Sequence, residues 1–284
     1  MDDIMAQASR MNYENKIFPH DSREMSELPD NSVNLMVTSP PYNVTKQYDD
    51  DLSLSEYLAL LEDILTEVHR VLKPGGIAAL NIANAGRKPY LPLDSYIINI
   101  FKSINYSIIQ EIIWNKAASA GGSCAWGSWK SASNPSLRDV HEYIIIAQKK
   151  GSETPIALPF DDINKFPEKI EHKTLDIDLQ EYITDIWSFN TESAKRVNHP
   201  APFPAELPFR IITFFTHKGD LVLDPFMGSG SAAIAAVVSG RKFIGYDIDP
   251  QYVKLAYKRV KELKINLRKS RNANKEKNSL LNFI

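Results

Sequence analysis

A glycine turn near the carboxyl end of the chain constrains the fold most, because it lies between an apolar strand and a helix of small residues. The turn is Asp224–Ser231, with the sequence DPFMGSGS. Leu221–Leu223 is the expected strand before it, and Ala232–Val238 is the expected helix after it. A further strand, Lys242–Tyr246, leads to Asp247. A strand, glycine turn, helix, strand and acid in this order are typical of a nucleotide-binding α/β unit.

The same turn satisfies a loose dinucleotide fingerprint, Gly228-x-Gly230-x-x-Ala233. On this motif alone, a nicotinamide-dependent oxidoreductase is an alternative. A full dinucleotide fold normally has several strands after the fingerprint, whereas only one strand and one helix follow here. No Gly-Lys-Ser/Thr sequence follows the turn, so a phosphate-cradling P-loop is not supported. The pattern favours a ligand with an adenosine-like ribose, whose hydroxyls suit Asp247.

The earlier part of the chain alternates strands with helices, which is the pattern of a parallel sheet. The clearest helix is Leu54–Leu72, whose apolar residues recur at helical spacing. Ser53 and Glu56 form a capping box before it, and Lys73–Gly76 ends it. Further helices are expected at Leu93–Ile104, at Glu206–Thr216 and from Asp249-Pro250 onward. Further strands are expected at Lys16–His20, Val33–Val37, Ile77–Ile82 and Ser107–Trp114.

A rigid loop follows the strand Val33–Val37. Its sequence is Thr38-Ser39-Pro40-Pro41-Tyr42-Asn43. The two prolines fix their own φ angles, remove two backbone donors and push Ser39 out of the α region. Ligands bind at the carboxyl ends of strands in open α/β sheets, so the Ser39 hydroxyl and the Tyr42 ring are candidate ligand contacts. From this stretch alone, a strand-ending turn with a packed tyrosine is an equal alternative.

Two irregular segments interrupt the pattern. Asn115–Asp139 is rich in Gly, Ser and Ala and carries Trp126 and Trp129 among basic residues. This composition suits a loop that contacts nucleic acid, or a lid that packs its tryptophans on the body. Val140–Gln148 is expected to return as an antiparallel strand beside Ser107–Trp114. The second segment, residues 151–198, shows no clear period and suggests an insertion.

Composition and charge narrow the class of protein. The chain has 284 residues, 43% hydrophobic and 24% charged, which is an ordinary soluble composition. It has no apolar run of membrane-spanning length and no secretory signal, so we expect a cytoplasmic protein. Its single cysteine, Cys124, excludes an internal disulfide, and its six scattered histidines indicate no metal site. The segment from Lys258 onward has a net charge of +7, because it contains nine Lys/Arg and two Asp/Glu. A segment this basic can bind a polyanion or form a solvated helix.

Taken together, these motifs resemble the S-adenosylmethionine-dependent amino-methyltransferases of DNA, from about Lys16 to Val260. The stretch that contains Ser39 looks like the catalytic loop of this family, and the glycine turn looks like its cofactor loop. His199–Pro204 is similar to the segment that helps close the cofactor pocket. The catalytic loop comes first, as in the permuted β group. The resemblance implies a mostly parallel, twisted α/β sheet of the methyltransferase type, circularly permuted, with an irregular target-recognition insertion.

The resemblance also implies roles for individual residues. The catalytic candidates are Ser39, Pro40, Pro41 and Tyr42. Asp21 is similar to the acid near the adenine ring, and Asp247 to the acid that holds the ribose. The remaining cofactor-binding candidates are Asp224, Pro225, Phe226, Gly228, Ser229, Gly230, His199 and Pro202. The chain departs from the family at Ser231-Ala232, where two threonines are frequent.

The first residue of the catalytic loop implies the target base. In this family Asp-Pro-Pro-Tyr usually accompanies methylation of the adenine 6-amino group, and Ser-Pro-Pro-Tyr that of the cytosine 4-amino group. Ser39 therefore implies cytosine-N4 methylation, with adenine as the alternative. The base must be flipped out of double-stranded DNA to be reached. Methylation of a cytosine carbon would need a cysteine nucleophile, and Cys124 lacks the preceding proline of such a site.

The resemblance implies a prokaryotic or phage protein of a restriction-modification system. Its candidate partners are DNA, a cognate restriction endonuclease and a second copy of the chain. A non-catalytic DNA-binding protein and an RNA or protein substrate are further alternatives. The expected organisation is a catalytic half (1–114), a target-recognition region with the returning strand 140–148 (115–198), a cofactor-binding half (199–260) and a basic tail (261–284).

Overall fold

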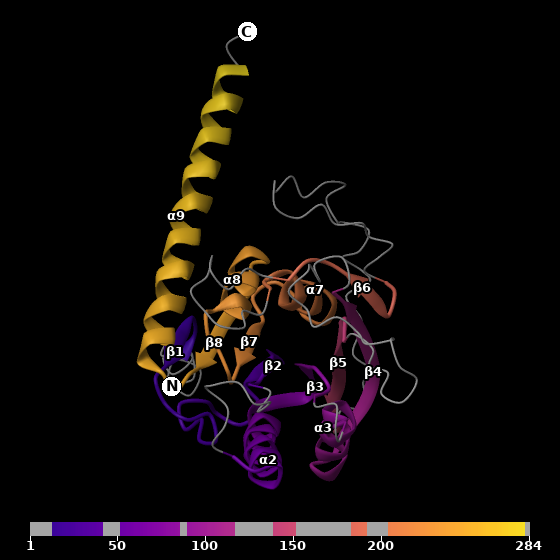
Figure 1. Ribbon diagram of the computed structural model, residues 1–284. Coiled ribbons are helices and arrows are strands. Elements are labelled where there is room, and N and C mark those ends of the chain that lie inside the picture. Colours follow the sequence, from indigo (N-terminus) through magenta and orange to yellow (C-terminus); the bar gives the residue numbers. More distant parts are fainter. Residues whose placement is uncertain are drawn as a thin grey trace.

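The computed structural model of the chain describes residues 13–41, 52–85, 90–116, 139–151, 183–191 and 204–281. Within these residues, eight strands form one sheet in the order β1-β8-β7-β2-β3-β5-β4-β6 (Figure 1). The strands are β1 Lys16–Phe18, β2 Val33–Thr38, β3 Leu72–Ile82, β4 Tyr106–Asn115, β5 His141–Lys149, β6 Ile186–Ser188, β7 Leu221–Asp224 and β8 Lys242–Tyr246. All neighbours are parallel except those of β5, which is antiparallel to both β3 and β4.

Strands from the two ends of the chain lie side by side in this sheet. β7 pairs with β2, where Leu223 is opposite Met36, and β8 pairs with β1, where Ile244 is opposite Lys16. The mostly parallel sheet that closes around a circular permutation is therefore confirmed. The expected return of β5 beside β4 is also confirmed. β5 pairs with β3 as well, so it separates two strands that follow each other in the chain.

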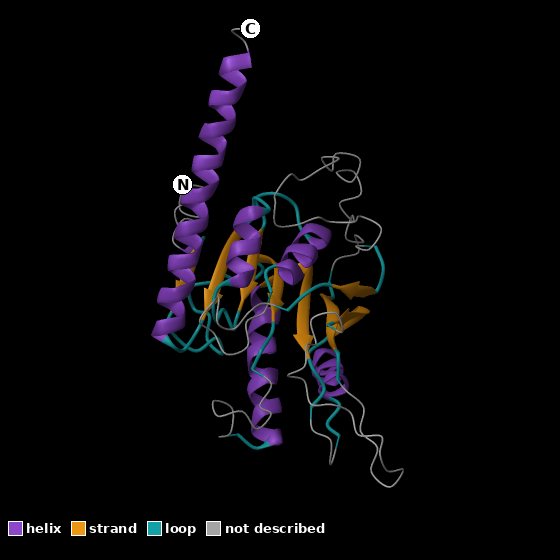
Figure 2. Cartoon of the chain, turned by 45° about the horizontal axis from the view of Figure 1, so that its top comes forward, coloured by secondary structure: helices purple, strands orange, loops and turns teal. Residues whose placement is uncertain are grey.

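Helices cover both faces of the sheet and create two cores (Figure 2). α2 (Leu54–Val71) and α3 (Leu93–Ser103) pack on one face. α7 (Glu206–Phe215), α8 (Ser231–Val238) and α9 (Pro250–Leu281) pack on the other.

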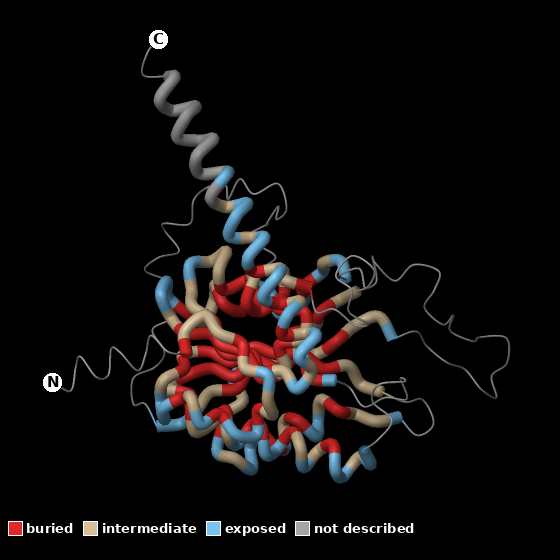
Figure 3. Tube along the Cα trace, turned by 90° about the vertical axis from the view of Figure 1, so that its left-hand side faces the viewer, coloured by how far each residue is buried: buried red, intermediate tan, exposed pale blue. Residues whose placement is uncertain are grey.

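Strand β2 shows why its sequence is a continuous apolar run. Met36 belongs to the core beneath α2, whereas Leu35 and Val37 belong to the opposite core. A strand buried on both faces needs apolar side chains at consecutive positions. Figure 3 shows the resulting buried layer of strands between helices that expose their outer faces.

The junction between α2 and β3 differs from the expectation. The capping box of Ser53 and Glu56 is confirmed, but α2 ends at Val71 and β3 begins at once with Leu72. Leu72 lies opposite Val33, and the register then shifts so that Ile77 lies opposite Leu35. The expected helix stop, residues 73–76, is therefore an irregular stretch inside the strand, where Gly75 adopts a φ of 80°.

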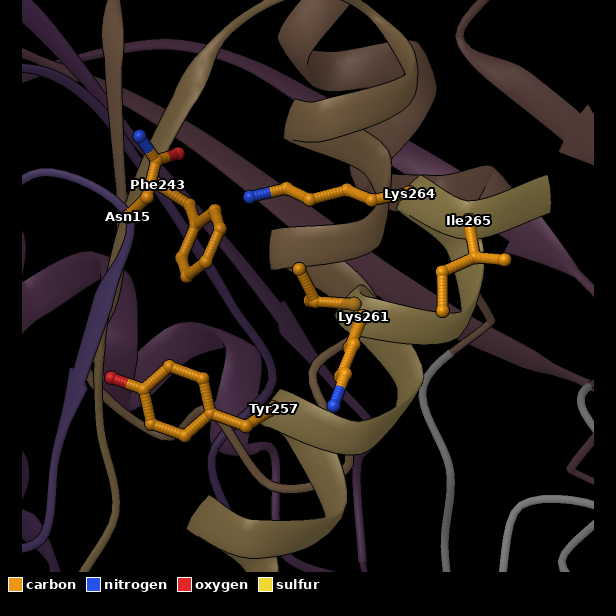
Figure 4. A pocket seen from close by; sticks show the side chains of 7 residues that line it. Asn15, Phe243, Tyr257, Lys261, Lys264 and Ile265 are labelled. Atoms are coloured by element: carbon orange, nitrogen blue, oxygen red, sulfur yellow. The ribbon is translucent and has the colours of Figure 1, made fainter. Parts of the chain in front are cut away.

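α9 starts at the carboxyl end of β8 and runs back along the sheet. It continues to Leu281, so residues 261–281 of the basic segment are helical, and the helix extends beyond the amino ends of the strands (Figures 1 and 2). Tyr257, Lys261 and Lys264 near its start line a cavity of about 300 Å³ against Phe243 and Asn15 (Figure 4). None of the described helices combines the length and apolar character that crossing a bilayer requires.

Candidate active site

The two loops singled out by their sequence lie next to each other at the centre of the sheet. Thr38 ends β2 and Asp224 ends β7, and these strands are parallel neighbours. From this pair the chain continues to β3 on one side and to β8 on the other. A crevice forms where connections diverge in this way, and it is the usual ligand site of open α/β sheets.

A buried hydrogen bond joins the two loops. The Thr38 hydroxyl donates to Asp224 Oδ1 over 2.6 Å, although the two residues are 186 positions apart in the chain. The same carboxylate oxygen accepts the N–H of Phe226 over 3.1 Å, which fixes the first turn of the cofactor loop. Asp224 therefore sets the position of both loops at once.

The described part of the catalytic loop is held at both ends. Asn81, near the end of β3, donates from Nδ2 to Ser39 Oγ over 3.3 Å. Tyr57, in the first turn of α2, donates from its hydroxyl to the Pro41 carbonyl over 2.7 Å. Pro40, between them, is buried. Two positions of this loop are thus fixed by side chains from other elements.

Sequence reasoning did not identify either of these supporting residues. Tyr57 recurs at helical spacing with apolar residues and is indistinguishable from a core tyrosine. Asn81 left a signal, because it is a single amide in the apolar strand sequence Ile77–Ile82. A buried amide requires hydrogen-bond partners, so its presence there indicates a specific contact.

The cofactor loop lies directly above β8. Gly228 donates its N–H to Asp247 Oδ2 over 2.8 Å, and Met227 donates its N–H to the Tyr246 carbonyl over 2.9 Å. A Cβ atom at Gly245 would overlap the Met227 side chain. Gly230 adopts a φ of 84° and caps α8. A Cβ atom there would lie 2.8 Å from Cβ of Ala256 in α9.

Helix α9 holds the same loop through Arg259, a further residue not predicted from the sequence. Its guanidinium donates to the Ser229 carbonyl over 2.5 Å and to the Ser229 hydroxyl over 2.8 Å. Ser231, the first residue of α8, has a buried hydroxyl that forms no hydrogen bond with the described residues. The loop therefore combines a fixed backbone with a hydroxyl that can serve a ligand.

Two carboxyl groups give the crevice its electrostatic character. Burial raises the pKa of Asp224 to about 7, and burial also raises the pKa of Asp247. In the part of the chain that the structure describes, neither group forms an ion pair. A cationic ligand would offset the cost of burying negative charge here. S-adenosylmethionine carries a sulfonium and an ammonium group, so the residues present fit this cofactor.

Asp21 and Asp247 follow neighbouring strands. Phe18 of β1 lies opposite Tyr246 of β8, and the Asp247 N–H donates to the Phe18 carbonyl over 3.1 Å. The Asp21 carboxylate accepts a hydrogen bond from the Arg23 guanidinium over 2.7 Å, and this hydrogen bond lowers the pKa of Asp21. The structure thus brings both predicted acids to the same side of the glycine loop.

His20, beside Asp21, has a structural role, because its ring forms a hydrogen bond and an aromatic contact. Its Nε2 lies 2.7 Å from Glu27 Oε1, and its ring meets the Tyr246 ring edge-on at 5.1 Å. The hydrogen bond to Glu27 raises the pKa of His20, although burial alone would lower it.

Several predicted residues lie outside the described residues. They are Tyr42 of the catalytic loop and His199 and Pro202 of the segment before the cofactor half. Cys124, Trp126 and Trp129 of the first irregular segment also lie outside the described residues, as does most of 151–198. Their roles stay predictions.

Similar proteins are found by family, by sequence and by structure. A sequence model of the family described as DNA methylase matches residues 33–258. The Type II methyltransferase M.MthZI of Methanothermobacter thermautotrophicus is 31% identical over 277 residues, covering 87% of this chain and 76% of that protein. The DNA adenine methyltransferase YhdJ of Escherichia coli (strain K12) is 29% identical over 256 residues, covering 84% of this chain and 79% of that protein. TTHA0409 from Thermus thermophilus, complexed with S-adenosyl-L-methionine, superposes with a TM-score of 0.66 at 26% identity, covering 88% of this chain and 94% of that one.

Proposed function

Because the chain belongs to the N6/N4 family of DNA methylases, we propose that it methylates the 4-amino group of cytosine in double-stranded DNA, using S-adenosylmethionine. The observation that carries this proposal is the Thr38–Asp224 hydrogen bond, which places the Ser39 loop beside the glycine loop. Amine and methyl donor must meet at one point, and this contact brings together the segments suited to each. The serine at position 39 supports cytosine as the target.

The cofactor would lie along the glycine loop. Asp247 would hold the ribose and Asp21 the adenine ring. Asp224, Pro225, Phe226, Gly228, Ser229 and Gly230 would surround the methionine part, with His199 and Pro202 closing the pocket. When bound, the cofactor supplies an electrophilic methyl group. Its positive charge suits the raised pKa values of Asp224 and Asp247, since both carboxyl groups gain from a nearby cation.

The catalytic loop activates and positions the amine. An exocyclic amine is a poor nucleophile because its lone pair is delocalised into the ring. The Ser39 oxygen and the Pro40 carbonyl would accept hydrogen bonds from the two N–H groups of the target amine. These hydrogen bonds would draw the nitrogen toward a tetrahedral geometry. Tyr42 would stack on the flipped base. The chain supplies no covalent nucleophile in this scheme, so its contribution is orientation.

Residues 115–198 are proposed to recognise the DNA site, since the sequences on either side of the strand at 140–148 show no regular strand or helix period. A restriction endonuclease with the same site is the proposed biological partner in a prokaryotic or phage system, in keeping with the name of the relative M.MthZI. A second copy of the chain is a further proposed partner.

Adenine-N6 methylation is the second candidate function. The observation that favours it is the similarity to YhdJ, a protein named as an adenine methyltransferase. The two candidates share the fold, the cofactor and the catalytic loop, so only the product distinguishes them.

The test is to incubate the purified chain with unmodified DNA and methyl-labelled S-adenosylmethionine, and to separate the nucleosides. We expect N4-methylcytosine. N6-methyladenine would assign the chain to the second candidate, and unlabelled DNA from a folded, cofactor-binding protein would overturn DNA methylation. Ser39→Ala should transfer the methyl group far more slowly, at a residual rate that single-turnover kinetics still measures, and should keep its affinity for the cofactor.

A further inference from the structure

A polar array crosses three strands behind the catalytic serine. Asn81 lies near the end of β3, Glu142 near the start of β5, and Lys116 directly after β4. Asn81 Nδ2 donates to Glu142 Oε2 over 2.5 Å, and Lys116 Nζ donates to Glu142 Oε1 over 2.5 Å. Asn81 Nδ2 also donates to Ser39 Oγ over 3.3 Å. The array therefore ends on the hydroxyl proposed to receive the target amine.

Glu142 determines which way the amide of Asn81 faces. An ionised carboxylate can only accept hydrogen bonds, so the side of Asn81 turned toward it must be the NH₂ group. The same nitrogen contacts Ser39. Asn81 therefore presents a donor to the serine oxygen and cannot take a proton from it at that atom. The geometry indicates a fixed hydrogen bond and excludes proton transfer from Ser39 to Asn81 Nδ2.

The array lies in surroundings that make a charged pair costly. Asn81 is 1% and Glu142 8% exposed, and their strand neighbours Leu80, Ile144 and Ile145 are completely buried. An ion pair in such a place contributes little to stability compared with apolar residues of the same size. Its contribution is instead to fix the orientation of the groups that it bonds.

We propose that Asn81, Glu142 and Lys116 are positioning residues that hold the Ser39 hydroxyl oxygen where the exocyclic amine needs its acceptor. This inference rests on the proposed function. Lys116 holds Glu142, Glu142 holds the amide of Asn81, and Asn81 holds Ser39. A misplacement of about 1 Å in such a contact can lower a rate about 100-fold.

The test compares Asn81→Ala in two backgrounds by the single-turnover rate of methyl transfer to DNA. In the wild-type background we expect a rate about 10-fold to 100-fold lower, with cofactor affinity unchanged. In the Ser39→Ala background we expect no further loss, because the residue that Asn81 positions is already absent. Rate losses that multiply in the double variant would overturn the proposal.

The ion pair provides a second test that is independent of the folding of Asn81→Ala. Lys116→Met and Glu142→Gln should lower the single-turnover rate, whereas Lys116→Arg should retain most of it because it restores the cation. Glu111→Gln is the matched control, since Glu111 lies on β4 opposite Ile145 and makes no contact in the array. An unchanged rate in both Lys116→Met and Glu142→Gln would refute the positioning role.

These outcomes are distinguishable from failure of the proposed function. If the wild-type chain transfers no methyl group to DNA, the proposed function fails. If the wild-type chain is active and the Asn81, Glu142 and Lys116 variants are equally active, only the positioning array fails.

Discussion

Asp224 is an enclosed carboxyl group at the place where the two halves of the sheet meet. The residue is 2% exposed, and burial raises its pKa from 3.8 to about 7. Between these two values the group is protonated in the folded protein and ionised in the unfolded chain. The folded protein therefore holds a proton that unfolding releases, and its stability must depend on pH.

We expect Asp224→Asn to gain stability relative to the wild type as pH rises from about 5 to about 8. A group whose pKa is raised by folding contributes its full stabilisation below the pKa it has in the unfolded chain. This stabilisation is lost as pH rises through the pKa it has in the folded protein. The amide of the variant does not titrate. The difference in free energy of unfolding between the variant and the wild type should therefore grow by about 3 kcal/mol over this range. Urea unfolding without ligand at both pH values measures it. Equal differences at the two pH values would contradict the raised pKa.

Asp224 should also make cofactor affinity depend on pH. Above about pH 7 its anion would attract the sulfonium, so S-adenosylmethionine should bind more tightly relative to S-adenosylhomocysteine, which lacks that charge. The two ligands share their amino and carboxyl groups, so the ratio of their dissociation constants isolates the sulfonium. Calorimetric titration of both ligands measures this ratio. In Asp224→Asn we expect the ratio to vary much less with pH.

Helix α9 is the element that shapes the cofactor loop from outside the sheet. It contacts the loop through Ala256, which lies against Gly230, and through Arg259, which bonds Ser229. The loop can approach the helix this closely only because position 230 has no side chain. The packing of α9 and the shape of the predicted cofactor site are thus parts of one contact.

Gly230→Ala should be more destabilising than an alanine at another glycine with the same backbone geometry. The matched control is Gly219→Ala, because Gly219 has a φ of 89° but nothing within 4 Å of the added Cβ. The control should lose about 1 kcal/mol from backbone strain alone. Gly230→Ala adds a contact at 2.8 Å with Ala256 and should lose about 1–3 kcal/mol more, together with cofactor affinity. Thermal unfolding and cofactor titration compare the two, and equal losses would mean that α9 does not constrain the loop.

At the scale of the molecule, the alternation of strands and helices predicts a mostly parallel sheet, and the resemblance to the permuted β group of methyltransferases implies its permutation. Hydrophobic periodicity cannot predict that β5 lies between β3 and β4, because it identifies a strand but not both of its neighbours in the sheet. β6, Ile186–Ser188, was missed because three residues in an aperiodic segment carry no pattern. The sequence predicts that the strand after α2 begins at Ile77, whereas β3 begins at Leu72. The reason is that Pro74 and Gly75, which ordinarily end a helix, here belong to an irregular strand.

The loops of the site could be predicted, but their supports could not. Ser39 and the glycine turn have local sequence patterns. Asn81, Glu142 and Lys116 meet only because β5 lies between β3 and β4 in a particular register, and no local pattern encodes that contact. Arg259 reaches Ser229 from a helix whose packing is equally non-local.

The distal part of α9 should be dispensable for chemistry. The helix runs away from the carboxyl ends of the strands, where the site lies (Figure 1). Among the residues of α9 whose burial the structure describes, Val260 is the last that is buried. A chain that ends after Leu267 should keep the stability and the single-turnover rate of the full chain. Its DNA affinity should show an unchanged salt dependence on a short duplex. A shallower dependence would show that the basic end contacts phosphates.

The Thr38–Asp224 contact has a consequence for synthesis of the protein on the ribosome. Thr38 precedes the catalytic loop, and its partner Asp224, at the end of β7, is translated 186 residues later. Until β7 and β8 have been translated, β2 lacks a parallel neighbour on that side and the proposed cofactor site is incomplete. We therefore expect a nascent or prematurely terminated chain that lacks β7 and β8 to be inactive.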